Sequence, residues 1–282
     1  MKQKIIAVIG SQGKTGVRVL KKLEDSGYAT RGLSRRSKTP FDWNRRETWV
    51  QALDGIHSVY VTYYPDLAVP DAELDMKAFV ELAKEKDIKH VVLLSGRGEE
   101  GAQRAEAVIK ECGLSWNIVR ASWFMQNFSE SFMLDGIQSG ELILPEAKAR
   151  EPFIDVDDLT DVVVAALTRI ELNNQLLEVT GSEMLTFTDC VKTISEATQQ
   201  HIVYSGIPVD AFLAGAKAQG VPDDMAWLIN ELFVNVLDGR NEWTTDTVEK
   251  VLGRPAGRFD EYVARTAQSG VWTIPKHVRF NS

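Results

Sequence analysis

Apolar and polar residues follow two alternating patterns from the start of the chain to about residue 198. Short, almost wholly apolar runs such as Ile5-Ile6-Ala7-Val8-Ile9 are followed by longer segments whose apolar residues recur at helical spacing. The short runs predict buried β-strands, and the longer segments predict amphipathic helices. Strands are therefore expected near residues 4–9, 28–34, 57–62, 89–95, 115–119 and 175–180, and helices near 14–26, 46–53, 72–86, 102–112, 157–169 and 187–198.

This alternation of strand and helix predicts the fold class α/β, with a Rossmann-type doubly wound parallel sheet covered by helices on both faces. In such a sheet, ligands bind in the crevice beyond the C-terminal ends of the strands. From about residue 121 the regularity weakens, and residues 121–155 and 200–282 carry aromatics, prolines and short helical runs. Segments of this kind are expected to cover the sheet near the ligand.

The first apolar run ends in three glycines, Gly10, Gly13 and Gly16, with the spacing G-x-x-G-x-x-G. A tight turn from strand to helix gathers backbone N–H groups and the positive end of the helix dipole at one point, where a diphosphate binds. The spacing differs from the commoner G-x-G-x-x-G, but the strand before it and the helix after it are the context that the motif requires. The turn therefore predicts a dinucleotide site. A Walker A loop is excluded, since Val8 stands where its first glycine would fall.

The second strand runs into the basic segment Ser34-Arg35-Arg36-Ser37-Lys38. An NAD-selective site places an acidic residue here, about 20 residues after the glycine turn. Two arginines with flanking hydroxyls instead suit the 2′-phosphate of NADP. We therefore expect NADP(H) to be preferred over NAD(H). Residues 1–155 are expected to form an NADP-binding Rossmann domain, and residues 156–282 a smaller α/β substrate-covering region, interleaved with the first and contributing a strand to its sheet.

Composition and charge narrow the classes of partner. The chain is 44% hydrophobic and 26% charged, as in ordinary globular proteins, and its net charge of −8 argues against direct nucleic-acid binding. Two cysteines and scattered histidines offer no spacing for a metal site. We expect a cytoplasmic monomer or homodimer without membrane contact, because no signal peptide and no apolar stretch long enough for a bilayer is evident.

Several segments carry a resemblance to a known family. Besides the glycine turn, these are the segments that begin Asp54-Gly55-Ile56-His57, Cys112-Gly113-Leu114-Ser115, Trp123-Phe124-Met125-Gln126, Pro152-Phe153-Ile154-Asp155 and Leu177-Glu178-Val179-Thr180. In combination they resemble the NmrA-like atypical short-chain dehydrogenase/reductases. Gly13-Lys14-Thr15 and Phe41-Asp42-Trp43 are similar to the ergot-alkaloid (festuclavine/agroclavine) dehydrogenase subgroup, which includes enzymes that reduce a cyclic iminium with NADPH.

One departure from the wider superfamily concerns the catalytic acid. Ordinary short-chain dehydrogenases use Tyr-x-x-x-Lys, but the segment 101–110 contains no tyrosine. Two explanations fit. The protein is either an NADPH-dependent reductase of a flat, electron-poor acceptor, such as an imine, iminium or quinone, that needs little acid from the protein. Or it is a catalytically silent NADP(H)-binding redox sensor that acts through a protein partner.

The expected site follows from the ends of the strands and from the resemblance. Cofactor contacts are expected from Gly10, Ser11, Gln12, Gly13, Lys14, Thr15, Gly16, Ser34, Arg35, Arg36, Thr62 and Ser95. A pocket for an aromatic or cationic small molecule is expected from Tyr63, Tyr64, Arg97, Trp123, Phe124, Met125 and Phe128. Ser95, as a hydrogen-bond donor, and Tyr63 are the candidate catalytic residues.

Overall fold

The computed structural model describes residues 4–273, which divide into two compact units. Unit 1 comprises residues 4–121, 156–179 and 246–254, and unit 2 comprises 122–155, 180–245 and 255–273. The chain passes from unit 2 to unit 1 at the expected boundary, residue 155, but residues 122–155 belong to unit 2 and residues 156–179 to unit 1. Residues 156–179 belong to unit 1 because α6 (Val156–Thr168) covers its sheet and β7 (Gln175–Val179) joins it.

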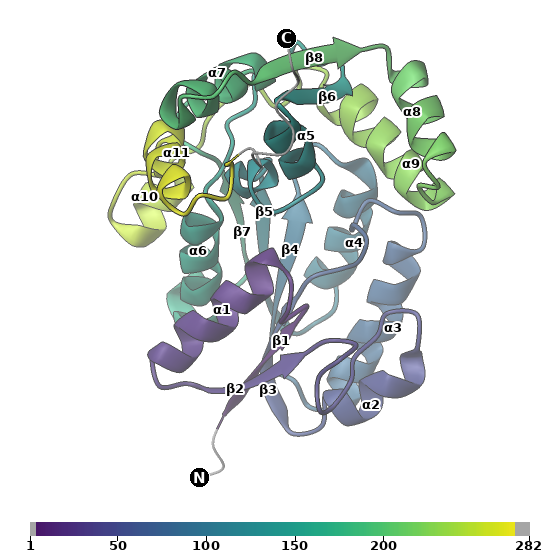
Figure 1. Cartoon of the computed structure of the whole chain (residues 1–282). Coiled ribbons are helices and arrows are strands. Elements are labelled where there is room, and N and C mark those ends of the chain that lie inside the picture. The colour runs from purple at the N-terminus through teal and green to yellow at the C-terminus, as the bar shows by residue number, and fades with distance from the viewer. Residues whose placement is uncertain (1–3, 274–282) are drawn as a thin grey trace. The chain divides into compact units, whose positions relative to one another are not determined.

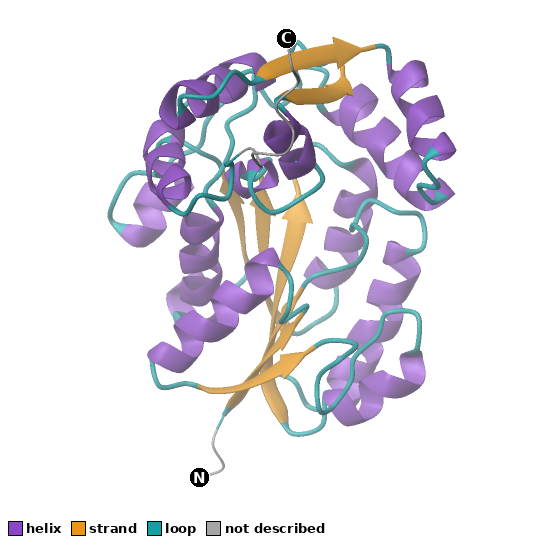
Figure 2. Ribbon diagram, viewed as in Figure 1, coloured by secondary structure: helices purple, strands orange, loops and turns teal. Residues whose placement is uncertain are grey.

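Unit 1 is built on a parallel sheet of six strands (Figures 1 and 2), and it confirms the expected fold class. The strand order is β2-β1-β3-β4-β5-β7. Each of these strands lies within two residues of an expected one: β1 (Ile5–Ile9), β2 (Ala29–Leu33), β3 (Ile56–Val61), β4 (His90–Gly96), β5 (Ser115–Ala121) and β7. Because β2 and β3 lie on opposite sides of β1, the order reverses there, and such a switch point is where ligands bind in α/β sheets.

Helices cover both faces of this sheet (Figure 1). On one face α1 (Lys14–Asp25) packs against α6, which also contacts α10 (Thr247–Leu252). The other face carries α2 (Trp49–Ala52), α3 (Ala72–Glu85) and α4 (Glu100–Lys110). The helix expected at 46–53 is instead a 3-10 turn, η1 (Arg46–Thr48), followed by the short α2. A second 3-10 turn, η3 (Ile170–Leu172), precedes β7.

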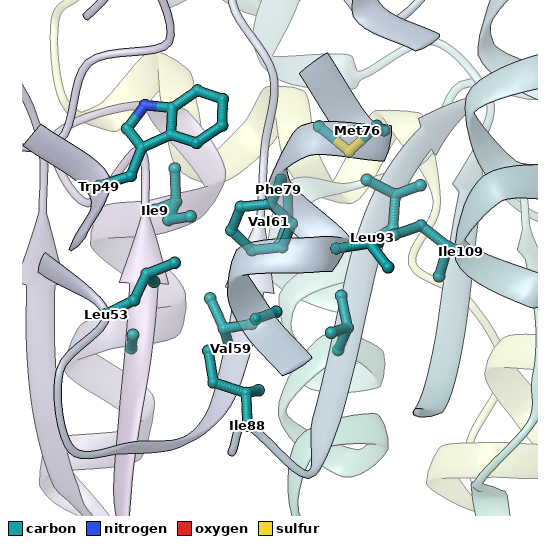
Figure 3. Packing of buried hydrophobic residues seen from close by; sticks show 14 of the residues in the cluster. Ile9, Trp49, Leu53, Val59, Val61, Met76, Phe79, Ile88, Leu93 and Ile109 are labelled. Atoms are coloured by element: carbon teal, nitrogen blue, oxygen red, sulfur yellow. The ribbon is translucent and has the colours of Figure 1, made fainter. Parts of the chain in front are cut away.

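The core between the sheet and the helices α2, α3 and α4 is apolar and closely packed (Figure 3). Val59 and Val61 of β3, Leu93 of β4, and Phe79 and Met76 of α3 belong to this one core cluster, and all five side chains are fully buried. Full burial of a side chain of this size stabilises the fold by about 1.5–3 kcal/mol. β1 is apolar on both faces, as its continuous apolar run predicted.

Unit 2 pairs two short parallel strands, β6 (Glu141–Pro145) and β8 (Val203–Ile207). Its helical elements are η2 (Met125–Phe128), α5 (Met133–Ser139), α7 (Phe187–Thr198), α8 (Val209–Ala218), α9 (Asp223–Asn230), the π-helix η4 (Glu231–Val236) and α11 (Phe259–Gln268). Aromatic rings fill the core: Phe128 contacts Phe153, Phe187 and Phe259 at centroid distances of 5.4, 6.1 and 5.5 Å. Within residues 4–273, no helix has the length and apolarity that crossing a membrane requires.

Candidate functional site

The glycine turn connects β1 to α1 and admits no side chain at two of its three glycines. Gly10 has a φ of 74°, and a Cβ there would lie 2.2 Å from Thr62 Oγ1. A Cβ on Gly16 would lie 2.1 Å from the carbonyl oxygen of Gly10. The absence of a side chain at Gly10 and Gly16 thus lets the backbone of the turn lie directly against Thr62 and against the first turn of α1.

This turn fits an anionic group. Gly13 is the N-cap of α1, and the first turn of that helix contains no acidic residue. Backbone N–H groups of a first helical turn lack intrahelical partners and carry the positive end of the dipole. Gln12 and Gly13 are exposed, whereas Ser11 and Thr15 are buried. The turn lies where the strand order reverses, so its position, charge and narrowness all suit a dinucleotide diphosphate.

Thr62, the first residue after β3, supports the turn. Its hydroxyl donates to the carbonyl oxygen of Ile9 at 3.1 Å, and its own carbonyl accepts from Trp43 Nε1 at 2.9 Å. These bonds join the ends of β1 and β3 to the loop that follows β2. The side chain expected to contact a cofactor therefore lies directly against Gly10.

The basic loop after β2 is closed by its own hydroxyls. Ser34 N–H donates to Ser37 Oγ at 3.0 Å, and Arg36 N–H donates to Ser34 Oγ at 3.2 Å. Arg35 and Arg36 remain exposed. Arg35 holds its guanidinium over the ring of Tyr64, 5.0 Å from the centroid. The structure therefore brings the two arginines and Tyr64 together on the edge of unit 1 that carries the glycine turn.

Tyr63 requires a correction. Its hydroxyl donates to Asp75 Oδ2 on α3 at 2.6 Å, and its ring packs 4.9 Å from that of Trp43. Burial and the Asp75 carboxylate raise the pKa of Tyr63 well above its usual value. The phenol proton is donated to Asp75 and is harder to release than that of an exposed tyrosine, which does not fit the catalytic role expected for Tyr63.

Ser95 also differs from the expectation. It is buried at the end of β4, and its hydroxyl donates to Glu106 Oε1 at 2.7 Å. Glu106, on α4, is fully buried and accepts a second hydrogen bond from Arg120 Nε at 2.8 Å. The single hydroxyl proton of Ser95 is thus directed at Glu106, and in this arrangement it is not available for a substrate oxygen.

A buried ion network extends from this pair. Arg120 of β5 contacts Glu178 of β7 at 3.3 Å, and Glu178 accepts from Arg97 Nε at 2.9 Å. Burial alone would raise the pKa of Glu106, but hydrogen bonds from Arg120 and Ser95 outweigh it and the pKa lies below the usual value. Glu106 is therefore ionised at neutral pH.

The sequence analysis missed this network. The available signal was a charged residue within each of two strands expected to be apolar, Arg120 at the end of β5 and Glu178 in β7. Arg97, expected in the substrate pocket, belongs to this network and is buried.

The pocket residues expected after β5, Trp123, Phe124, Met125 and Phe128, divide into two groups within unit 2. Trp123 and Phe124 are half-buried, and Trp123 packs edge-on against Phe187 and Phe233 at 5.7 and 5.4 Å. Met125 and Phe128 instead lie in the core of unit 2 with at most 1% of their surface exposed. That burial leaves them no surface for a substrate, which corrects the expectation for these two. Among residues 4–273, no cluster of His, Cys, Asp or Glu could hold a metal ion.

Known proteins resemble this chain over nearly its whole length. The NAD(P)H azoreductase of Xenophilus azovorans is 26% identical over 282 residues, covering 92% of this chain and 96% of that protein. The agroclavine dehydrogenase of Claviceps fusiformis is 27% identical over 288 residues, covering 95% and 99%. The structure of an NADPH-dependent quinone oxidoreductase from Escherichia coli, complexed with NADPH, superposes with a TM-score of 0.78 at 16% identity, covering 92% and 99%, and so shares the fold.

Residues 39–262, most of the chain, match the NmrA-like family. That match confirms the family resemblance and covers the quoted segments after the glycine turn. The chain belongs to the NmrA-like family.

Proposed function

We propose that this protein is an NADPH-dependent oxidoreductase that transfers hydride to a flat, electron-poor organic acceptor of the imine/iminium or quinone type. One observation carries the proposal: the narrow, acid-free glycine turn and the exposed Arg35–Arg36 loop lie at the same edge of the unit 1 sheet. The names of its relatives, an azoreductase and an agroclavine dehydrogenase, support a reductase of nitrogen-containing or extended π-systems.

In this proposal the chain binds and orients the cofactor. The glycine turn holds the diphosphate, with Lys14 adding positive charge, and Arg35 and Arg36 hold the 2′-phosphate, which favours NADP(H) over NAD(H). When bound, the nicotinamide supplies the hydride. Trp123 and Phe124, which keep exposed surface, are the aromatic residues we retain as substrate contacts.

The acceptor class follows from the groups that cannot donate a proton. Glu106 is held ionised by Arg120, and the Tyr63 hydroxyl is held by Asp75. A cationic iminium already carries the charge that hydride neutralises, and a reduced quinone can take its proton from water. Acceptors of these classes therefore need the least from such a site, whereas a simple ketone needs an acid.

The test follows NADPH absorbance with a panel of triarylmethane dyes, cyclic imines, quinones and, as a comparison, simple ketones. We expect NADPH consumption with at least one cationic or quinoid acceptor and none with the ketones. NADPH binding without consumption by any of them would contradict the proposal.

That contradicting outcome defines the alternative, a catalytically silent NADP(H)-binding redox sensor that acts through a protein partner. The observation that favours it is the Ser95–Glu106–Arg120 arrangement. Glu106 there forms an ion pair with Arg120 and is not a proton donor. A sensor would bind a stoichiometric protein partner from cell extract in a manner that depends on whether NADP⁺ or NADPH is present. A reductase has no need of such a partner.

A further inference from the structure

Tyr64 and its neighbour Tyr63 point to different surroundings. Tyr63 is half-buried against Trp43 and bonded to Asp75, whereas Tyr64 is 61% exposed. The ring of Tyr64 is a large aromatic surface in water, and its described contact is with the Arg35 guanidinium at 5.0 Å. A guanidinium placed over an aromatic face in this way is held by a cation–π attraction.

The loops that carry Arg35 and Tyr64 are held by buried aromatic residues and hydrogen bonds. The loop after β2 is held at its far end by Phe41, which is buried and stacked on Trp49, and by the bond from Phe41 N–H to the Ser34 carbonyl. The next aromatic residue, Trp43, donates to the Thr62 carbonyl, two residues before Tyr64. The chain thus fixes the backbone of both loops, so Arg35 and Tyr64 face each other across supported segments rather than across mobile ones.

We infer that Tyr64 is a positioning residue for cofactor selectivity, which holds Arg35 in place for the 2′-phosphate of NADP(H), and not part of the substrate pocket. This inference rests on the proposed function and deepens it. A guanidinium has two faces and an edge of N–H donors. A ring against one face leaves the in-plane donors available to a phosphate and restricts the rotamers of an otherwise exposed arginine. Less conformational entropy is therefore lost when the phosphate binds.

Tyr64 and Arg35 should have different effects on binding, because Arg35 carries the charge and Tyr64 only holds it in place. The ring itself makes no bond to a phosphate, so its removal should weaken ligands that carry the 2′-phosphate and leave those without it unchanged. The hydroxyl should be dispensable, because a cation–π contact depends on the ring. Tyr28, another exposed tyrosine of unit 1, just before β2, has no cation–π contact among those the structure gives, and it provides a matched control.

The experiment measures binding of adenosine 2′,5′-bisphosphate and of 5′-AMP to the full chain by calorimetry, and of NADPH and NADH by fluorescence. Tyr64→Ala should weaken the two 2′-phosphorylated ligands by about two- to fivefold, the worth of an exposed cation–π contact, without affecting 5′-AMP or NADH. Tyr64→Phe should restore the original affinities, and Tyr28→Ala should change none of them. In the Arg35→Ala background, Tyr64→Ala should have no further effect.

The outcomes distinguish the inference from the proposed function. If neither the parent chain nor any variant binds NADPH, the proposed function is wrong. If the parent prefers NADPH but Tyr64→Ala keeps the same NADPH-to-NADH affinity ratio, only the role of Tyr64 is overturned. An equal loss for all four ligands also overturns it, since that result indicates a general contact with the adenosine or a disturbed loop.

Discussion

At the scale of single residues, the glycine turn contains two glycines with different tasks. Gly16 has no room for a side chain, since a Cβ would meet the Gly10 carbonyl at 2.1 Å, whereas a Cβ on Gly13 would lie 3.3 Å from the same oxygen. Gly13 is exposed and has an extended backbone (φ −85°, ψ 172°), which valine adopts readily. The lack of a side chain at Gly16 is therefore required by the fold, and at Gly13 we expect it to leave room for the cofactor diphosphate.

This difference gives a paired prediction. Gly13→Val should lower the melting temperature only modestly, because valine is a poor N-cap and its Cβ would lie 3.3 Å from the Gly10 carbonyl oxygen. It should lose NADPH binding, because its side chain occupies the space over the helix N-terminus. Gly16→Ala should lower the free energy of unfolding by about 1–3 kcal/mol, the usual cost of overpacking. Thermal melts with and without NADPH measure both effects. A Gly13→Val protein that binds NADPH normally would show that the diphosphate lies elsewhere.

The adjacent tyrosines show where prediction from sequence ends. Both follow β3, so strand topology correctly places them at the C-terminal edge of the sheet. Which one turns inward depends on Asp75 from α3 and Trp43 from another loop, and no local pattern records those partners. The same holds for Ser95, whose partner Glu106 comes from the next helix. The motif residues were predictable, and the directions of their neighbours were not.

At the scale of secondary structure, unit 1 follows from hydrophobic periodicity because short apolar runs, most complete in β1 (IIAVI) and β4 (HVVLLSG), alternate with helical patterns. Unit 2 does not. Its strands β6 and β8 are short and pair across a gap of many residues, and in β6 exposed Glu141 and Ile143 alternate with buried Leu142 and Leu144. Short strands of this kind are stabilised by their partners more than by their own sequence, so local patterns missed them.

The ion network links three elements, α4, β5 and β7, through Glu106, Arg120 and Glu178. Glu106→Gln should lower the free energy of unfolding at neutral pH by about 3–5 kcal/mol, because it leaves the Arg120 cation without its closest partner. Denaturant unfolding measures the loss. Glu73→Gln, on the partly exposed surface of α3, is the control and should change stability little.

The pKa of Glu106 adds a pH dependence to that prediction. Because the pKa of Glu106 in the folded protein lies below its usual value of 4.5, its contribution to stability is present above that pH and is lost as the pH falls through the lower folded pKa. The parent should therefore lose stability more steeply than Glu106→Gln on acidification below about pH 4.5, and the two unfolding curves should converge. Parallel curves would mean that the pKa of Glu106 is the same in the folded and unfolded states.

At the scale of the whole molecule, each unit is assembled from three separate stretches of chain. A single cut at the boundary expected from sequence, residue 155, would remove α6 and β7 from unit 1. The edge of β5 would lose its parallel neighbour, and the buried apolar face of α6, including Leu159, Val162 and Val163, would leave its site on the sheet uncovered. Arg120 would also lose Glu178.

We therefore expect residues 1–155 alone to show no cooperative unfolding and to aggregate, although they contain the whole predicted cofactor motif. An open strand edge and an uncovered apolar face both favour association between chains. Circular dichroism melts and light scattering of this fragment test the expectation, and addition of residues 156–282 provides the control. Recovery of NADPH binding only in the mixture would indicate that the missing stretches complete the sheet. A 1–155 fragment that melts cooperatively and binds NADPH by itself would instead establish residue 155 as a true domain boundary.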